Sequence, residues 1–300
     1  MDGLVLVRKP SGPTSHDIVA RLRRILGTRK IGHGGTLDPF AEGLLIIATG
    51  KATRLFPYFA LSEKTYEGRI RLGSATDTYD LTGRPLAAPA GPLPDRTLLL
   101  EAMARFQGDL IQFAPPFSAK KLEGKPFYAY ARSGLTVEPR PCPVRIDRFT
   151  LRAFKAPDID FEVSCSAGTY IRALAHDLGV ALGCGAHLVQ LLRTGSGEFR
   201  LENAQTLEKI EADLSEGHPD RFLLPMETLL PGLPRVLLTE IGRRFVGNGH
   251  PVNLSDPAVV SSADPIPSPE VIFRLFDASG RLIGLARRRE TSGVPFLVLI

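Results

Sequence analysis

The chain has 300 residues, of which 43% are hydrophobic and 23% charged, and its formal net charge is +5. This composition is typical of a globular protein, and no apolar run approaches the roughly 18 to 20 residues that a membrane span needs. The N-terminal sequence MDGLVLVRKP lacks the basic region, apolar stretch and cleavage site of a signal peptide, so the cytoplasm is the expected compartment.

The cysteines and histidines argue against a structural disulfide or metal. Cys142, Cys165 and Cys184 form an odd set without paired spacing, so neither a disulfide framework nor a cysteine-based zinc site is expected. The six histidines show no His-x-x-x-His spacing, which disfavours a structural metal.

Positive charge is concentrated near the N-terminus. Residues 1–72 contain 12 lysines and arginines against six acidic residues, an excess larger than that of the whole chain. A basic face of this kind suits a phosphate backbone. A solvated helix face, with Arg23 and Arg24 pointing at water, explains the charge equally well.

Strands and helices are predicted in an interspersed order without strict alternation. The apolar, turn and capping patterns predict strands at residues 4–7, 44–48, 65–72, 144–154, 159–166 and 186–192. They predict helices from an N-cap at Ser15 to a stop at Gly27, and at residues 97–106, 169–182 and 207–214. Gly32 to Gly43 is predicted to be a loop. This order favours an α+β fold with a largely antiparallel or mixed sheet flanked by helices.

The composition changes near residue 230, where Pro231, Gly232 and Pro234 form a plausible linker. We therefore expect two domains, 1–230 and 231–300. The second is predicted to contain one helix at 240–247 and strands near 271–276, 282–287 and 296–299, which is typical of a small β-rich domain.

The segment Lys30–Gly43 carries the strongest chemical signal. Asp38 precedes Pro39, which disfavours helix, and Gly32, Gly34 and Gly35 permit close backbone approach. A lone carboxylate in the most basic part of the chain weakens phosphate binding unless it does chemistry or pairs with a cation. The alternative is that Asp38 only caps a turn. A phosphate-binding glycine loop is disfavoured because the P-loop ending and the dinucleotide fingerprint are both missing.

Several motifs together resemble the tRNA pseudouridine synthase B (TruB) family. They occur in the family's order over roughly residues 4–230 and read KPSGPTSH (9–16), GHGGTLDP (32–39), KTY (64–66), TDTYD (76–80), PPFSA (115–119), GKPFY (124–128), CSAGTYIR (165–172) and AHLVQLLRT (186–194). The tail after Pro234 resembles, more weakly, the PUA module that often follows this catalytic domain. Two positions depart from the family pattern: Gly34 replaces a threonine or serine, and Leu192 replaces an arginine. The second departure leaves open which cation supports the strand near the site.

The resemblance implies a reaction that needs no cofactor. Isomerisation of the uridine at position 55 of the tRNA T-loop breaks the N1–C1′ bond, turns the base, joins C5 to C1′ and removes the C5 proton. One ionised carboxylate can attack C1′, stabilise an oxocarbenium-like centre, or remove a sugar proton. The resemblance implies that Asp38 is this carboxylate, and the choice among the three roles stays open.

The resemblance also implies the partners of Asp38. Arg172 would pair with Asp38 and keep it ionised, Tyr66 would stack on the uracil, and Tyr170 would face C5 as a candidate in the final deprotonation. Leu191 would form an apolar wall. His33 would brace the space left by the flipped nucleotide. Lys64 is a candidate phosphate contact, and Lys9, grouped with the substrate-binding residues, is expected to support the aspartate loop rather than to catalyse.

The expected partner is tRNA, bound through its T-stem-loop, with the C-terminal domain as the candidate contact to its acceptor end. No protein partner and nothing larger than a monomer is required. Two alternatives stay open: a non-catalytic RNA-binding protein built on the same scaffold, and a guide-RNA-dependent subunit like the dyskerin-like proteins. Activity of the purified chain on a bare T-stem-loop would exclude a guide requirement, and release of tritium from uridine C5 would exclude the non-catalytic alternative.

Overall fold

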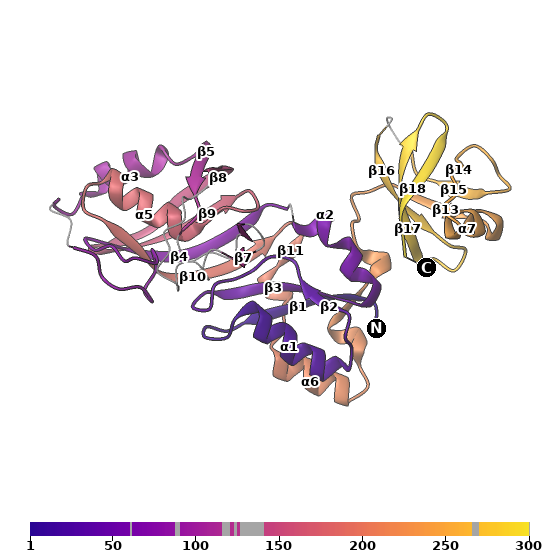
Figure 1. Ribbon diagram of the computed structural model, residues 1–300, viewed down its shortest axis with the longest axis horizontal. Coiled ribbons are helices and arrows are strands. Elements are labelled where there is room, and N and C mark those ends of the chain that lie inside the picture. Colours follow the sequence, from indigo (N-terminus) through magenta and orange to yellow (C-terminus); the bar gives the residue numbers. More distant parts are fainter. Residues whose placement is uncertain are drawn as a thin grey trace.

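A computed structural model describes residues 1–60, 62–87, 91–115, 121–122, 125–126, 141–265 and 270–299. Most of the PPFSA and GKPFY motifs therefore lies outside the described residues. Figure 1 shows an elongated molecule with a large sheet and its helices on one side and a small sheet on the other. Within the part of the chain that is described, no helix is long and apolar enough to cross a membrane.

The large sheet has the strand order β12-β1-β3-β10-β4-β9-β8-β5, with β2 added to β3 and β11 to β10. Its strands are β1 (Gly3–Lys9), β2 (Ile31–His33), β3 (Glu42–Thr49), β4 (Lys64–Leu72), β5 (Gly108–Phe113), β8 (Pro141–Lys155), β9 (Asp158–Cys165), β10 (Ala186–Ser196), β11 (Phe199–Arg200) and β12 (Leu223–Pro225). All of these pairings are antiparallel except the parallel β10–β3 pair. The predicted α+β fold with a mixed, largely antiparallel sheet is confirmed.

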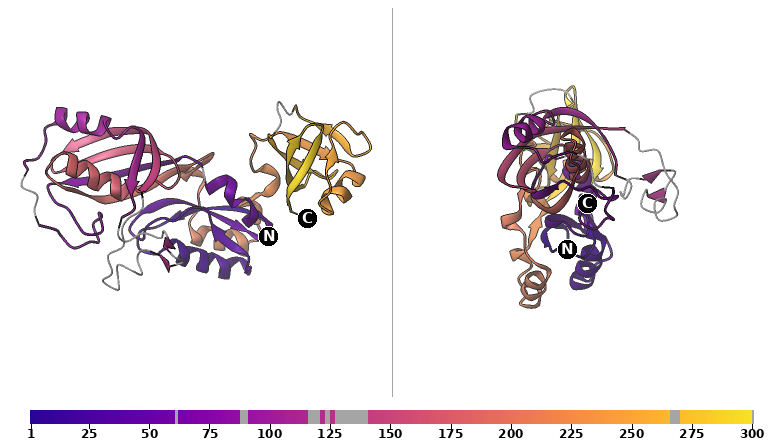
Figure 2. Two further views of the ribbon diagram at one scale, coloured as in Figure 1. Left: turned by 45° about the horizontal axis from the view of Figure 1, so that its top comes forward. Right: turned by 90° about the vertical axis from the view of Figure 1, so that its left-hand side faces the viewer.

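The helices around this sheet are α1 (Ser15–Leu26), α2 (Phe56–Ala60), α3 (Arg96–Ala104), α5 (Ile171–Ala181) and α6 (Leu207–Ser215), with short 3-10 turns at Gly50–Leu55, Leu201–Asn203, Pro219–Arg221 and Met226–Thr228. A separate two-stranded pair joins β6 (Lys121–Leu122) to β7 (Lys125–Pro126). Figure 2 shows α1 and α6 along the edge of the molecule near the N-terminus, and α3 and α5 near β8 and β9.

Local chemistry corrects several predicted boundaries. Thr14, not Ser15, caps α1, because its hydroxyl accepts from the Asp17 amide while the Asp17 carboxylate accepts from the Thr14 amide. The predicted loop at 32–43 is shorter, since its first residues belong to β2 and its last to β3. Helix α5 begins two residues later than predicted, with Tyr170 as its N-cap residue.

Along β4, one face of the large sheet is apolar and the other is charged, whereas β1 and β3 are buried on both faces. Tyr66, Ile70 and Leu72 alternate along β4 and pack with Leu174 and Leu178 of α5 in one buried cluster. The intervening residues of β4 lie on the opposite face, where two arginines form two-point ion pairs with aspartates of β9: Arg69 with Asp160 and Arg71 with Asp158. Period-two alternation therefore gives one face to the core and the other to solvent.

The small sheet has the order β14-β18-β17-β16-β13-β15. It consists of β13 (Arg235–Leu238), β14 (Val252–Asn253), β15 (Val260–Ala263), β16 (Ile272–Phe276), β17 (Leu282–Arg289) and β18 (Ser292–Val298), and α7 (Glu240–Gly247) packs beside it. Apolar side chains of β16 and β17 join a cluster that also contains Leu4, Leu55 and Phe199. The two parts of the chain thus share buried apolar contacts.

Candidate functional site

Hydrogen bonds from residues near the N-terminus hold the Asp38 loop on both sides of the aspartate. The Leu37 amide donates to the Ser15 hydroxyl at 2.8 Å, and that hydroxyl donates to the Leu37 carbonyl at 3.0 Å. The Lys9 ammonium donates to the carbonyls of Pro10, Pro39 and Ala41 at 2.7–3.0 Å. Because Ser15 and Lys9 are buried, these bonds hold the loop in one conformation.

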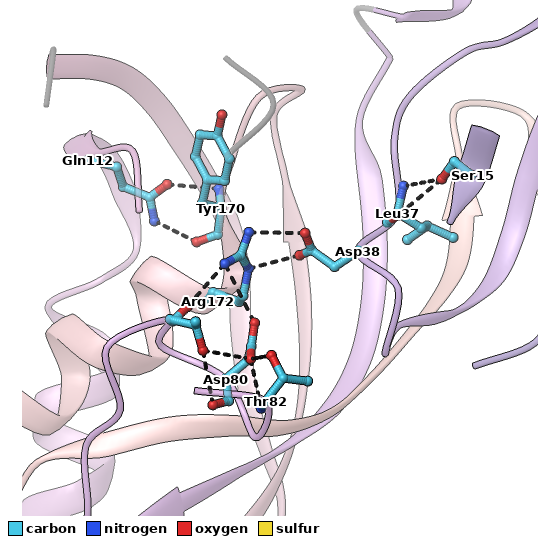
Figure 3. A network of polar contacts seen from close by, with 9 residues as sticks. Ser15, Leu37, Asp38, Asp80, Thr82, Gln112, Tyr170 and Arg172 are labelled. Carbon is cyan, nitrogen blue, oxygen red and sulfur yellow. Dashed lines mark hydrogen bonds and ion pairs between the residues drawn. The ribbon is translucent and has the colours of Figure 1, made fainter. Parts of the chain in front are cut away.

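Arg172 meets Asp38 in a two-point ion pair (Figure 3). Its Nε donates to Oδ2 at 2.9 Å and its Nη2 to Oδ1 at 3.0 Å. The other side of the guanidinium faces the carbonyl of Thr78 at 3.0 Å and the carboxylate of Asp80 at 3.5 Å. Arg172 is 4% exposed, so its orientation is fixed by these partners and not by water.

The two carboxylate oxygens of Asp80 have different partners, one in its own turn and the other in Arg172. Oδ1 accepts from the hydroxyls of Thr78 and Thr82 and from the Thr82 amide at 2.6–2.9 Å, whereas Oδ2 faces Arg172. The carboxylate therefore stabilises both its own turn and the guanidinium.

Gln112 of β5 fixes the backbone at the start of α5. Its side-chain oxygen accepts from the Tyr170 amide at 3.0 Å, and its side-chain nitrogen donates to the Tyr170 carbonyl at 3.2 Å. In Figure 3 the Tyr170 ring stands near the Asp38–Arg172 pair with its hydroxyl directed away from the pair.

A cleft of about 280 Å³ brings the predicted catalytic residues together. Its lining residues are Gly35, Thr36, Leu37, Asp38, Lys64, Tyr66, Ala167, Gly168, Thr169, Tyr170, Ile171, Arg172, Leu191 and Arg193. Burial raises the pKa of Tyr66, so this side chain is a neutral phenol in the cleft. Leu191 supplies an apolar wall beside it.

Lys64 also lines the cleft, but its ammonium is engaged with backbone. It donates to the carbonyls of Ser62 at 2.7 Å and Phe59 at 3.3 Å. Burial lowers the pKa of Lys64 to about 8, and the nearby Arg193 acts in the same direction. A phosphate contact by Lys64 stays a prediction.

Lys9 and His33 do not line this cleft. Lys9 points into the Asp38 loop, in the supporting position that the sequence analysis expected. His33 lies on β2, and its Nδ1 atom is buried with no hydrogen-bond partner in the part of the chain that is described. Burial, together with the charge of Arg193 and a smaller effect of His16, lowers the pKa of His33. The predicted bracing role of His33 has no contact in the cleft to support it and stays a prediction.

Arg193 is the cation that supports the strand near the site. Its Nε donates to the Leu44 carbonyl at 2.7 Å and its Nη2 to the Gly35 carbonyl at 3.2 Å. Its own backbone packs against Gly43, where a Cβ atom would lie 2.3 Å from the Arg193 carbonyl oxygen. Only glycine fits there.

The Gly34 departure also has a steric reason. A Cβ atom at position 34 would lie 3.1 Å from the ring of Phe56, which also covers Gly32. A threonine or serine at position 34 would therefore require the Phe56 ring to shift by a few tenths of an ångström.

Sequence reasoning did not assign roles to Asp80, Gln112 or Arg193. Asp80 and Arg193 stand inside motifs that carried the resemblance, and an acidic residue in a TDTYD turn was a usable signal. Gln112 had no such signal, because its partner is the backbone of a residue 58 positions away. Among the described residues no cluster of three or more histidine, cysteine, aspartate or glutamate side chains could hold a metal ion.

The buried Lys9 ammonium predicts a rise in stability at alkaline pH. Burial lowers the pKa of Lys9 to about 8 from its ordinary 10.5. Between these values the unfolded chain binds more protons than the folded one, so the unfolding free energy rises with pH. The rise due to Lys9 should be at most about 3 kcal/mol. Urea unfolding of the parent and of Lys9→Met at several alkaline pH values measures it as a widening difference, and a constant difference would contradict this prediction.

Two family models match the chain consecutively. The TruB family pseudouridylate synthase N-terminal domain matches residues 23–171, and the tRNA pseudouridylate synthase B C-terminal domain matches residues 172–231. Several curated relatives carry the name tRNA pseudouridine synthase B. That of Solibacter usitatus is 43% identical over 83% of this chain and 85% of its own length. That of Burkholderia lata is 41% identical over 96% of this chain and 87% of its own length. That of Opitutus terrae is 46% identical over 78% of this chain and 96% of its own length.

Solved structures with the same fold include an RNA–protein complex and a protein complex. A structure of an H/ACA RNP bound to a substrate RNA containing 2′-deoxyuridine matches with a TM-score of 0.73 and 25% identity, covering 99% of this chain and 85% of that one. A Cbf5-Nop10-Gar1 complex matches with the same TM-score and coverage at 27% identity. The similarity extends through the small C-terminal sheet.

Proposed function

This chain belongs to the TruB family of pseudouridylate synthases, and from this premise we propose that the Asp38 cleft is its active site. It isomerises uridine to pseudouridine in tRNA, with the T-loop uridine at position 55 as its target. The observation that carries the site assignment is the two-point pair between Asp38 and Arg172 inside a cleft that also contains Tyr66, Tyr170 and Leu191.

The proposed role of Asp38 is to act on the ribose of the target nucleotide. Its carboxylate lies at the cleft with both oxygens held by one guanidinium, so its direction is set before substrate binds. An oriented anion can attack C1′, stabilise positive charge as the N1–C1′ bond breaks, or remove a sugar proton. N1 of the base is bonded to C1′ in the substrate, and C5 is bonded to C1′ in the product. The detached uracil therefore has to be retained close to the carboxylate.

The proposed role of Tyr66 and Leu191 is to retain that uracil. A neutral aromatic ring stacks on the π-face of a flipped base, and an apolar side chain beside it excludes water from the sugar carbon. Exclusion of water matters here because hydrolysis at C1′ would leave an abasic site instead of the isomer.

Tyr170 is proposed to lie near C5 of the turned base. Its backbone is fixed by Gln112, whereas its ring borders the cleft. Removal of the C5 proton follows C5–C1′ bond formation and restores the uracil ring, so a group at this position would assist product formation and not bond cleavage.

Binding of the T-loop is proposed to use the basic N-terminal part of the chain. Arg8, Arg24, Arg29, Lys30 and Lys51 are exposed there. Extrusion of the target nucleotide costs a few kcal/mol, which phosphate contacts can offset. His33 and Lys64 remain the proposed contacts close to the extruded nucleotide.

We also propose that the chain acts as a monomer in the cytoplasm, without a guide RNA or an obligatory protein partner. The division into residues 1–230 and a PUA-like domain at 231–300 is part of this proposal, with the second domain reaching the acceptor end of tRNA. Arginines of that domain form ion pairs with Glu240 and Glu270, namely Arg243, Arg244 and Arg287. A weaker electrostatic contribution than that of the N-terminal region is therefore expected there.

The test uses a T-arm stem-loop with tritium at C5 of its uridines. The purified chain alone should release the label of one uridine per RNA, and replacing uridine 55 by cytidine should abolish that release. Binding of the RNA without release would instead support a non-catalytic RNA-binding protein. Release only after addition of a guide RNA would support the guide-dependent alternative.

Affinity for tRNA should fall steeply with salt, because phosphate contacts release counterions. For about four phosphate contacts, raising monovalent salt from about 50 to 200 mM should weaken binding by more than about tenfold. Fluorescence anisotropy of a labelled tRNA over that range measures the slope. A flat response would contradict a basic binding face.

A further inference from the structure

The turn that supports Arg172 contains a strained aromatic residue. Tyr79 has φ of 65°, in the left-handed region that a bulky side chain rarely adopts. It lies between Thr78, whose carbonyl accepts from Arg172, and Asp80, whose carboxylate pairs with it. A residue in this conformation is stable only where the surrounding contacts compensate for the strain. For Tyr79, such contacts come from its side chain.

The Tyr79 ring stacks on the imidazole of His176. The ring centroids are 3.8 Å apart and the planes differ by 12°. Burial raises the pKa of Tyr79 and lowers that of His176, so both rings are neutral near pH 7 and stack without a charge between them. Among the described residues, the Nδ1 atom of His176 is buried without a hydrogen-bond partner, and the imidazole contacts the Tyr79 ring by stacking.

His176 and Arg172 lie on the same face of α5. They are four residues apart in a helix that spans Ile171–Ala181, and side chains at this spacing are neighbours on the helix surface. The Thr78–Asp80 turn therefore contacts α5 at two successive positions: its carbonyl and carboxylate meet Arg172, and its aromatic ring meets His176.

The backbone of the turn is anchored on its other side. The Leu188 amide of β10 donates to the Tyr79 carbonyl at 3.0 Å, and the Leu81 amide donates to the Leu188 carbonyl at 2.9 Å. These bonds fix the turn to β10, and α5 packs on the same strand. With Tyr79 in the left-handed region, its ring meets His176 while Thr78 and Asp80 both contact Arg172.

We propose that Tyr79 and His176 are positioning residues, whose stacked rings set the Asp80 turn against α5 so that Arg172 holds Asp38 in its reactive orientation. This inference rests on the proposed catalytic role of Asp38. It assigns the stack a function in the chemical step and none in tRNA binding, since neither ring lines the cleft.

The experiment separates the ring from the backbone strain. Tyr79→Phe and His176→Phe keep a stack, Tyr79→Ala and His176→Ala remove it, and Tyr79→Gly removes the ring and also relieves the left-handed conformation. Single-turnover tritium release and tRNA affinity are measured for each. We expect the phenylalanine variants within about threefold of the parent rate, and the alanine and glycine variants slowed about tenfold or more with tRNA affinity within about twofold. The double alanine variant should be no slower than either single one.

Three results would overturn the proposal: a parental rate in Tyr79→Ala, recovery of the rate by Tyr79→Gly alone, or a loss of tRNA affinity that matches the loss of rate. Thermal unfolding identifies any unfolded variant, and Tyr79→Leu, which keeps apolar bulk without a ring, then replaces Tyr79→Ala. His250→Ala, which removes a histidine–phenylalanine contact in the small domain, is the matched control and should keep the parental rate. An inactive parent would refute the proposed function itself, whereas an active parent with unaffected variants would refute only the stack.

Discussion

Asp38→Asn is expected to abolish pseudouridine formation, with a loss of at least about 1,000-fold in single-turnover rate. Asparagine keeps the size and shape of the side chain but removes the negative charge. It cannot stabilise positive charge at C1′ as an anion does, it is a poor nucleophile, and it is not a base. All three possible roles of the carboxylate are lost together, so this result does not depend on which role is correct. Tritium release from C5-labelled tRNA measures the loss.

The control for Asp38→Asn is substrate affinity. Asp38 is one carboxylate in a positively charged region, so Asp38→Asn and Asp38→Ala should bind tRNA within a few-fold of the parent. Arg172 keeps Asp80 and the Thr78 carbonyl as partners in both variants, which should preserve the fold of the cleft. A large loss of affinity or of thermal stability would assign Asp38 a structural role instead.

The second large effect is expected at Arg172. Arg172→Lys keeps the positive charge, but an ammonium cannot place two parallel donors on the Asp38 carboxylate while also meeting Thr78 and Asp80. The carboxylate then loses its fixed direction, and the buried Asp80 loses a partner. We expect the single-turnover rate to fall by about 100-fold or more, because small errors in orientation have large effects on rate.

Arg69→Lys is the matched control for this variant. Arg69 also forms a two-point pair with an aspartate, Asp160, but on the charged face of the sheet, where both side chains are partly exposed. Its replacement should leave the rate within about twofold, since solvent screens an exposed pair and neither residue lines the cleft. Equal losses in both variants would mean that general destabilisation explains the Arg172 result, and a normal rate in Arg172→Lys would refute the need for a two-point contact.

Tritium release and tRNA affinity, measured together, separate the groups of residues proposed here. Asp38 and Arg172 should change the rate alone, exposed basic residues such as Lys30 should change affinity and its salt dependence, and Lys9 should change stability. A variant that changes a different quantity from the one expected would show that the role proposed for that residue is wrong.

The amino-acid pattern alone predicts the elements in which apolar residues recur regularly. The apolar spacing of residues 18–26 and the alternation of residues 65–72 fix which faces are buried, and both elements occur as expected. It also determined the chemistry available, because Asp38, Tyr66, Tyr170 and Arg172 stand in motifs whose residue types suit one reaction.

How these residues meet depends on long-range packing, which no local pattern predicts. Asp38 and Arg172 are 134 positions apart, and a contact over that distance depends on the parallel pairing of β10 with β3, which no local pattern encodes. The same holds for Gln112 on the Tyr170 backbone and for Tyr79 on His176. Local propensity acts over a few residues, whereas the direction of a buried side chain is set by all the elements that surround it, and these come from distant parts of the chain.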